Sequence, residues 1–258
     1  MAVWVAILLG LVQGLTEFLP ISSSGHLVLI ENIFGIENNI ILFDVVLHAG
    51  TLLAVILVYR KTLLEMIKNP FCDKVKQLVV ATIPTVIIAL IFKSFIEESF
   101  SGSLLAFGFL ITAFFLIVVQ IVSEKQYQYK KLNYKNSFVI GVFQGFALLP
   151  GISRSGSTIT SAIVQGVRRS DAAEFSFLLS IPIILASLLY ELIKVPSQTI
   201  SIPFIAFAVG FVFSVISGIL AIKLMLKVIK KAKYWYFSIY LILLSVFLLL
   251  NQFVFKLF

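Results

Sequence analysis

Long apolar runs separated by short polar segments dominate the pattern of this chain. Six runs come close to the length of about 20 residues that crosses the hydrocarbon core of a bilayer, and we predict a membrane-spanning helix for each. They lie at about 40–59, 77–97, 104–122, 172–190, 202–222 and 234–255. Two further apolar stretches, 2–21 and 137–149, are interrupted or followed by glycine and proline, and a polar cluster follows each. Neither has the pattern of a simple crossing.

The distribution of lysine and arginine predicts which segments face the cytoplasm. Three segments between the predicted spans are rich in these residues: 60–76, 123–136 and 223–233. Basic segments stay on the cytoplasmic side, whereas 98–103 and 191–201 are poor in basic residues and are expected outside. This sidedness is consistent only if 137–167 enters from the cytoplasm and returns to it, and 1–36 does the same from outside. We therefore expect two re-entrant helical hairpins.

Composition restricts the class of protein further. Of the 258 residues, 60% are hydrophobic and 12% charged, which excludes an ordinary water-soluble domain and a disordered chain. The net charge of +8 comes from short basic tracts between apolar runs, so it indicates membrane orientation and no nucleic-acid partner is expected. A single cysteine, Cys72, excludes a disulfide framework and a cysteine-rich metal cluster.

The two broken stretches are related in sequence. Residues 10–25 align with 141–156 without a gap, and seven of the sixteen positions are identical, among them Gly, Gln and Ser residues that apolar composition does not explain. Three predicted spans separate the hairpins, so the second half should lie upside down relative to the first. We predict an all-α integral membrane protein of one domain, 1–258. It would contain six spans and two hairpins in an inverted-topology repeat, 1–122 and 137–258.

Polar residues gather in the first broken stretch. Gln13 and Glu17 lie one helical turn apart on one face, and Pro20 ends that helix. The hydroxyl and backbone N–H groups at the start of the returning helix are candidates for binding phosphate-like oxygens. They belong to Ser22, Ser23, Ser24, Gly25 and His26. Capping of the helix by Ser22 and Ser24 is an equally good interpretation, whereas Glu17 and His26 could also transfer protons.

In the second broken stretch, Arg154 occupies the position that aligns with Ser23 of the first. Its polar residues are Ser153, Arg154, Ser155, Gly156, Ser157 and Thr158. An arginine at membrane depth is costly and needs a partner, and its guanidinium group matches phosphate oxygens in a bidentate manner. The alternative is a structural ion pair with Glu17 across the repeat. Half-helices that meet tip to tip present N-termini suited to an anion, so a negatively charged ligand is expected.

At these residues the chain resembles the undecaprenyl-diphosphatase family, the bacterial membrane phosphatases associated with bacitracin resistance. Three motifs carry the resemblance: [E/Q]xxxE at residues 13–17, SS[ST]GH at 22–26, and PGxSRSxxT at 150–158. It covers essentially the whole chain. Many members have glutamate where this chain has Gln13, so a carboxylate pair is not available on that face.

The resemblance implies hydrolysis of undecaprenyl diphosphate to the monophosphate, which renews the lipid carrier of cell-wall synthesis. It also implies a multi-pass protein of the bacterial inner membrane whose active site opens to the outer face. Together with the residue pattern, the resemblance implies that Ser23 is the candidate nucleophile and that His26 and Glu17 transfer protons. The alternative is attack by a water molecule that His26 or Glu17 activates. The diphosphate would be held by Arg154 and by Gln13, Ser22, Ser24, Gly25, Ser153, Ser155, Gly156 and Thr158.

Other partners and functions follow less directly. With two histidines and no HxxxH or HExxH pattern, no metal site made by the protein alone is expected. A divalent cation, Mg²⁺ or Ca²⁺, carried by the diphosphate would leave no signature, and the oligomeric state is not specified. Inverted repeats with broken helices are also typical of transporters, so a flippase for the same lipid is the alternative function. A membrane scaffold would leave Arg154 unexplained.

Overall fold

A computed structural model describes residues 1–36, 41–100, 102, 104–125, 129–194, 202–230 and 233–256. Over these residues the regular secondary structure is helical, apart from one isolated bridge between Lys130 and Val167, and turns and irregular segments join the helices. The helices are α1 (Val3–Phe18), α2 (Ser23–Ile33), α3 (Ile41–Val58), α4 (Arg60–Lys68), α5 (Asp73–Ile91), α6 (Lys93–Ser99), α7 (Leu105–Lys125), α8 (Tyr134–Phe146), α9 (Arg154–Val164), α10 (Arg169–Lys194), α11 (Phe204–Lys230) and α12 (Trp235–Leu250), followed by a short π-helix (Asn251–Phe255).

Five of these helices are long and apolar enough to cross a membrane: α5, α7, α10, α11 and α12. The count rises to six if α3 and α4, which meet at a bend of 77°, form one span. The expectation of a helical, multi-pass membrane protein is thus confirmed. The predicted boundaries need correction: the basic segment 60–76 begins with helix α4, and the span expected at 77–97 is α5, which starts at Asp73 and ends at Ile91. The expected outer segment 191–201 lies mostly outside the described residues.

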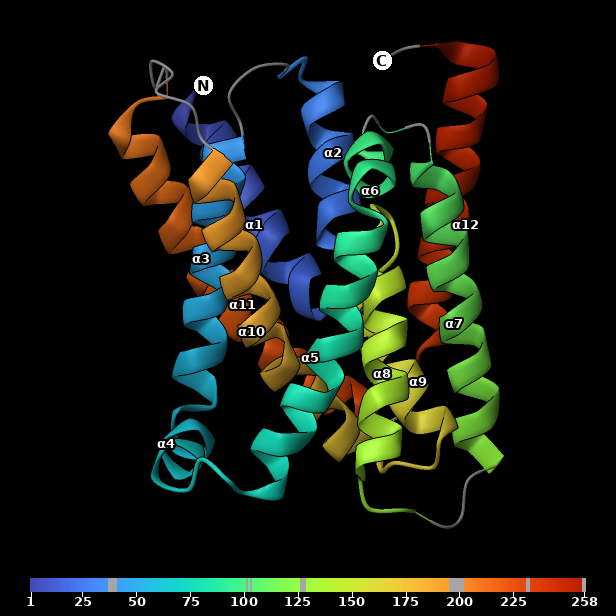
Figure 1. Cartoon of the computed structure of the whole chain (residues 1–258). Coiled ribbons are helices and arrows are strands. Elements are labelled where there is room, and N and C mark those ends of the chain that lie inside the picture. The colour runs from blue at the N-terminus through green and yellow to red at the C-terminus, as the bar shows by residue number, and fades with distance from the viewer. Residues whose placement is uncertain are drawn as a thin grey trace.

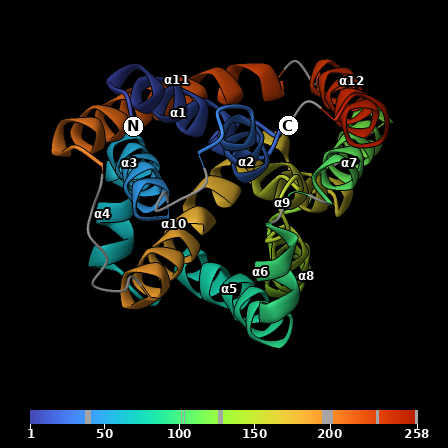
Figure 2. The ribbon, with the colours of Figure 1, turned by 90° about the horizontal axis from the view of Figure 1, so that it is seen from above.

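The two broken stretches form helix pairs that turn back on themselves. Helix α1 descends in Figure 1 to its end at Phe18, and α2 returns in the opposite direction from Ser23. Helices α8 and α9 do the same from the opposite end of the molecule. Seen from above in Figure 2, α2, α9 and α10 occupy the middle of the bundle, with α1 against α11 on one side and α7 against α12 on another. The two returning helices, α2 and α9, therefore lie inside the bundle.

Helices that carry two of the three basic segments, 60–76 and 123–136, lie at one end of the molecule. Helix α4 and the starts of α5 and α8 are at the bottom of Figure 1, where α7 also ends. The helices that carry these two segments share one end, as the lysine and arginine distribution requires of segments on the same side.

Glycines aligned in the repeat make equivalent contacts. A Cβ at Gly10 of α1 would overlap the carbonyl oxygen of Gly210 on α11. A Cβ at Gly141 of α8 would overlap the carbonyl oxygen of Ala81 on α5. Because α5 belongs to the first half of the chain and α11 to the second, each hairpin packs on a helix of the other half. Both close approaches require a residue without a side chain.

We expect Gly141→Val to lower the free energy of unfolding by about 1–3 kcal/mol, because the new side chain has no room against α5. Gly10→Val should have a comparable effect on the packing of α1 against α11. The unfolding midpoint of the purified protein in detergent measures both. The exposed residue Leu220 on α11 provides the control, since Leu220→Val should change stability by no more than about 0.5 kcal/mol. A Gly141→Val protein as stable as this control would contradict the close helix contact.

Candidate active site

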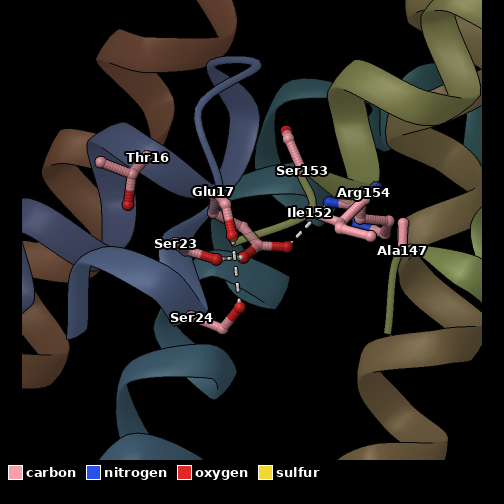
Figure 3. Close-up of a pocket in the computed structure, with 9 residues that line it drawn as sticks. Thr16, Glu17, Ser23, Ser24, Ala147, Ile152, Ser153 and Arg154 are labelled. Carbon is pink, nitrogen blue, oxygen red and sulfur yellow. Dashed lines mark hydrogen bonds and ion pairs between the residues drawn. The ribbon is translucent and has the colours of Figure 1, made fainter. Parts of the chain in front are cut away.

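The tips of the two helix pairs enclose a small polar cavity of about 40 Å³. Its lining comes from both pairs, and Figure 3 shows the two sets of side chains facing each other. The residues are Thr16, Glu17, Ser22, Ser23, Ser24, Ala147, Ile152, Ser153 and Arg154. A cavity of this size has room for water but not for a diphosphate group. A larger anion can enter only if some of the lining groups move apart.

An ion pair joins the two tips across this cavity. Arg154 Nη2 lies 2.7 Å from Glu17 Oε1, and the two side chains are only 12% and 7% exposed. The other carboxylate oxygen, Oε2, accepts a short hydrogen bond of 2.5 Å from the hydroxyl of Ser23. The ion pair considered in the sequence analysis therefore exists, and it also connects the arginine to the candidate nucleophile through one carboxylate.

Further hydrogen bonds hold this pair in place. Gln13 Nε2 donates to Glu17 Oε2 at 3.3 Å from one turn earlier on α1. Arg154 Nη1 donates to the backbone carbonyl of Ser176 on α10 at 3.1 Å. The hydroxyl groups of Ser176 and Thr158 lie 2.6 Å apart, so α9 and α10 are joined next to the arginine. Thr158, a predicted diphosphate ligand, thus lies behind Arg154 and outside the cavity lining.

Each returning helix begins at the cavity with a serine cap. Ser22 Oγ accepts from the backbone N–H of Gly25 at 3.4 Å, and Ser153 Oγ accepts from that of Gly156 at 3.0 Å. Both serines accept the hydrogen bond of an N-cap, so the capping interpretation holds for Ser22. The N–H groups of the two glycines are therefore engaged. Because the N-termini of α2 and α9 both open on the cavity, their partial positive charges favour an anion there.

The remaining predicted ligands of the serine clusters lie close to these caps. Ser24 Oγ lies 3.4 Å from Ser22 Oγ and lines the cavity. Ser155 Oγ lies 3.2 Å from Ser153 Oγ and donates to the carbonyl of Leu19 at 3.0 Å, which joins the two tips a second time. Ser155 is not part of the cavity lining.

His26 lies beside the cavity and does not line it. Its Nδ1 is 2.7 Å from the backbone carbonyl oxygen of Ser22, and its Nε2 is 2.7 Å from the hydroxyl of Tyr240 on α12. The ring is nearly parallel to that of Tyr240, at 14°, and meets the Phe109 ring edge-on. The side chain is 7% exposed. Protein groups therefore occupy both ring nitrogens.

Within the described parts of the chain, no group of three or more His, Cys, Asp or Glu side chains could hold a metal ion. The cavity offers one carboxylate, that of Glu17, together with serine and threonine hydroxyls. A divalent cation at this place would need most of its oxygen ligands from a bound diphosphate and from water.

Comparison with known proteins identifies the family. The family model described as bacitracin resistance protein BacA matches residues 6–247. This chain belongs to that family. Among its relatives, an undecaprenyl-diphosphatase of Carboxydothermus hydrogenoformans is 42% identical over 251 residues, with 96% of each chain covered. Undecaprenyl-diphosphatase 4 of Bacillus cereus is 39% identical over 250 residues, again with 96% of each chain covered. An undecaprenyl-diphosphatase of Christiangramia forsetii is 38% identical over 252 residues, covering 93% of this chain and 94% of the relative.

The sequence analysis of this BacA family member did not identify Thr16 and Ala147, which line the cavity. It also missed Ser176 and Tyr240, which hold Arg154 and His26. Ser176 lies within the apolar span α10, and Tyr240 lies within α12, more than two hundred residues from His26. A serine or a tyrosine in an apolar helix gives little signal by itself. The helical period would have placed Tyr240 on a face of α12, but only the packing of α12 in the bundle brings that face to His26.

Proposed function

We propose that this member of the BacA family hydrolyses undecaprenyl diphosphate to undecaprenyl phosphate and inorganic phosphate. By doing so it would renew the lipid carrier for peptidoglycan and other cell-wall polymers and confer resistance to bacitracin. The observation that carries the proposal is the chain of contacts from Arg154 through Glu17 to Ser23, which crosses from one tip to the other. The names of its relatives specify the same substrate.

Binding of the diphosphate begins with a change of partner for Arg154. In the structure, the guanidinium group is held by the carboxylate of Glu17 and by the carbonyl of Ser176. A phosphate group can accept two parallel hydrogen bonds from the guanidinium group, as a carboxylate does, and a diphosphate carries more negative charge than a carboxylate. We therefore expect the diphosphate to displace Glu17 from Arg154, which would widen the cavity between the tips. Ser153, Ser24 and the N-termini of α2 and α9 would share the remaining charge.

Once displaced, Glu17 is placed to act as a base toward Ser23. In the proposed step, the Ser23 oxygen attacks the terminal phosphorus while its proton passes to Glu17. The bond from that phosphorus to the bridging oxygen breaks, and undecaprenyl phosphate leaves with the electron pair of that bond. Water then hydrolyses the phosphoserine and releases inorganic phosphate. Direct attack by water, with Glu17 again taking the proton, requires the same residues but leaves Ser23 unmodified.

Mass spectrometry of acid-quenched enzyme separates these two routes. We expect a fraction of the wild-type protein, mixed with substrate and quenched within one turnover, to carry one added phosphoryl group on the peptide that contains Ser23. Ser23→Ala should lack this adduct and lose at least about 100-fold in kcat. Ser155→Ala serves as the control, because Ser155 lies outside the cavity lining and should leave the adduct on Ser23. Absence of the adduct together with full activity of Ser23→Ala would establish the water route.

The proposed topology places this site between two re-entrant hairpins. With α3 and α4 taken as one bent span, the chain would have six spans, and the hairpins α1–α2 and α8–α9 would enter from opposite faces in an inverted repeat. The equivalent caps Ser22 and Ser153, and the equivalent helix contacts of Gly10 and Gly141, support this proposal. The cavity would open to the outer face of the bacterial cell membrane.

Phosphate release from undecaprenyl diphosphate by the purified protein in detergent tests the proposed function. We expect inorganic phosphate and undecaprenyl monophosphate in equal amounts. Measurement with added Mg²⁺, with added Ca²⁺ and with chelator determines whether a cation accompanies the diphosphate. Failure to release phosphate in all three conditions would overturn the proposal, and movement of labelled lipid between leaflets of vesicles without hydrolysis would favour the transporter.

A further inference from the structure

The protonation of the His26 ring follows from its two neighbours. A backbone carbonyl only accepts, so Nδ1, 2.7 Å from the carbonyl oxygen of Ser22, carries the proton. In the neutral ring, Nε2 then accepts from the hydroxyl of Tyr240 at 2.7 Å. The imidazole thus connects α12 to the turn that precedes α2, and His26 is not among the residues that line the cavity.

The residue that receives this hydrogen bond has an unusual backbone. Ser22 has φ +69°, in the left-handed region that residues with a side chain rarely adopt. Its carbonyl oxygen accepts from the backbone N–H of His26 at 3.3 Å as well as from the ring. Such a conformation persists where the surroundings hold it in place, and here two donors of one residue fix the orientation of the carbonyl.

The second hairpin provides a comparison within the same chain. Ser153, aligned with Ser22, has φ −71°, an ordinary value. Ser157, aligned with His26, has a buried hydroxyl with no hydrogen-bond partner among the described residues. The positive φ of this tip falls instead on Gly151, at +85°, where it causes no strain. The left-handed serine and the histidine therefore occur together in one hairpin, and the aligned positions of the other hairpin have neither.

We propose that His26 and Tyr240 together hold Ser22 in its left-handed conformation, which directs the next residue, Ser23, toward Glu17. On this assignment Tyr240 is a positioning residue, and His26 acts through the backbone of Ser22 without transferring a proton to or from the substrate. As far as it concerns the reaction, this inference rests on the proposed phosphatase function.

A double-mutant cycle with Ser22→Gly tests the assignment. Glycine adopts φ +69° without strain, so it removes the need for the histidine. We expect His26→Ala to lower kcat by about 10-fold or more in the wild-type background and by no more than about 3-fold in the Ser22→Gly background. Ser153→Gly is the matched control, because Ser153 has an ordinary φ. In that background, His26→Ala should lower kcat by the same factor as in the wild type. If His26→Ala lowers kcat by the same factor in the wild-type, Ser22→Gly and Ser153→Gly backgrounds, the proposal is overturned.

Substitutions of His26 and Tyr240 distinguish positioning from proton transfer. The amide N–H of Asn can replace the Nδ1–H donor to the Ser22 carbonyl, whereas the amide of Gln reaches the position of Nε2 and leaves that carbonyl without its side-chain donor. His26→Asn should therefore keep a kcat about 5-fold or more above that of His26→Gln. Tyr240→Phe should lower kcat about 3- to 10-fold with KM unchanged, whereas Tyr236→Phe, an exposed tyrosine one turn earlier, should have no effect. Loss of one limb of the pH–kcat profile in His26→Asn would instead identify His26 as the proton-transfer group.

The same cycle can be measured without the reaction. The unfolding midpoints of the wild type, Ser22→Gly, His26→Ala and the double variant in detergent report whether glycine compensates for the loss of the histidine. If the wild-type protein releases no phosphate, the proposed function fails, while non-additive midpoints would still support the contact between His26 and Ser22. Additive midpoints would contradict that contact whatever the activity.

Discussion

Replacing Arg154 with alanine is expected to lower kcat/KM for undecaprenyl diphosphate by about 10³-fold or more, an effect of the size found when an arginine that stabilises a transferring phosphoryl group is removed. The guanidinium group lies at the start of α9 and is held by Ser176, where it faces the cavity between the tips. Arg154→Lys keeps the charge but not the planar fork, so it should recover only part of the activity. Phosphate release at several substrate concentrations measures these effects.

Two controls separate loss of chemistry from loss of folding. Arg168→Ala removes a basic residue whose side chain is 63% exposed and pairs with Asp171 outside the cavity lining. It should leave kcat/KM within about 2-fold of the wild type, as expected for an exposed ion pair. The Arg154→Ala protein should elute from gel filtration at the wild-type volume. An Arg154→Ala protein that folds and retains wild-type activity would remove the phosphate-binding role.

Glu17→Gln is expected to lower kcat by about 10²–10⁴-fold, the usual contribution of a positioned acid or base. The amide keeps the shape of the side chain and can still accept from Ser23, but it cannot take the proton of that hydroxyl. Since the charge that competes for Arg154 is also removed, KM for the diphosphate should stay the same or fall. A fall in kcat without a rise in KM is therefore the expected pattern.

Glu65→Gln provides the matched control, because this exposed residue of α4 lies outside the cavity lining and should leave both kinetic constants unchanged. A Glu17→Gln protein that keeps its kcat and only shows a raised KM would contradict the assignment of Glu17 as the base.

Much of the fold was predictable from the sequence because the bilayer restricts the choices. Apolar runs of nearly 20 residues must form helices there, since every backbone group needs a partner within its own segment. The runs at 104–122, 202–222 and 234–255 correspond to α7, α11 and α12 within a few residues at most boundaries. The bend between α3 and α4 was not predictable, because Tyr59 and Arg60 carry neither the proline nor the glycine that usually marks a break.

The candidate site was only partly predictable. The repeat brought Glu17, Ser23 and Arg154 to the same place because aligned residues of two halves indicate related positions. The pattern could not distinguish residues that line the cavity from those one layer behind it, such as Thr158 and Ser155, since a turn of helix or less separates the two groups and side-chain direction depends on packing. The contact of Tyr240 with His26 depends on the position of α12 and has no local signal.

Cysteine labelling tests most directly whether both tips line one diphosphate site that opens outward. In a background without the single natural cysteine, Cys72→Ser, a cysteine is placed either at Ser24 of the first tip or at Ala147 of the second, both of which line the cavity. We expect a membrane-impermeant maleimide to react with each from the outer face of right-side-out vesicles, and undecaprenyl diphosphate to slow both reactions. Reaction of the two cysteines from opposite faces, or protection of only one of them by the substrate, would contradict the account.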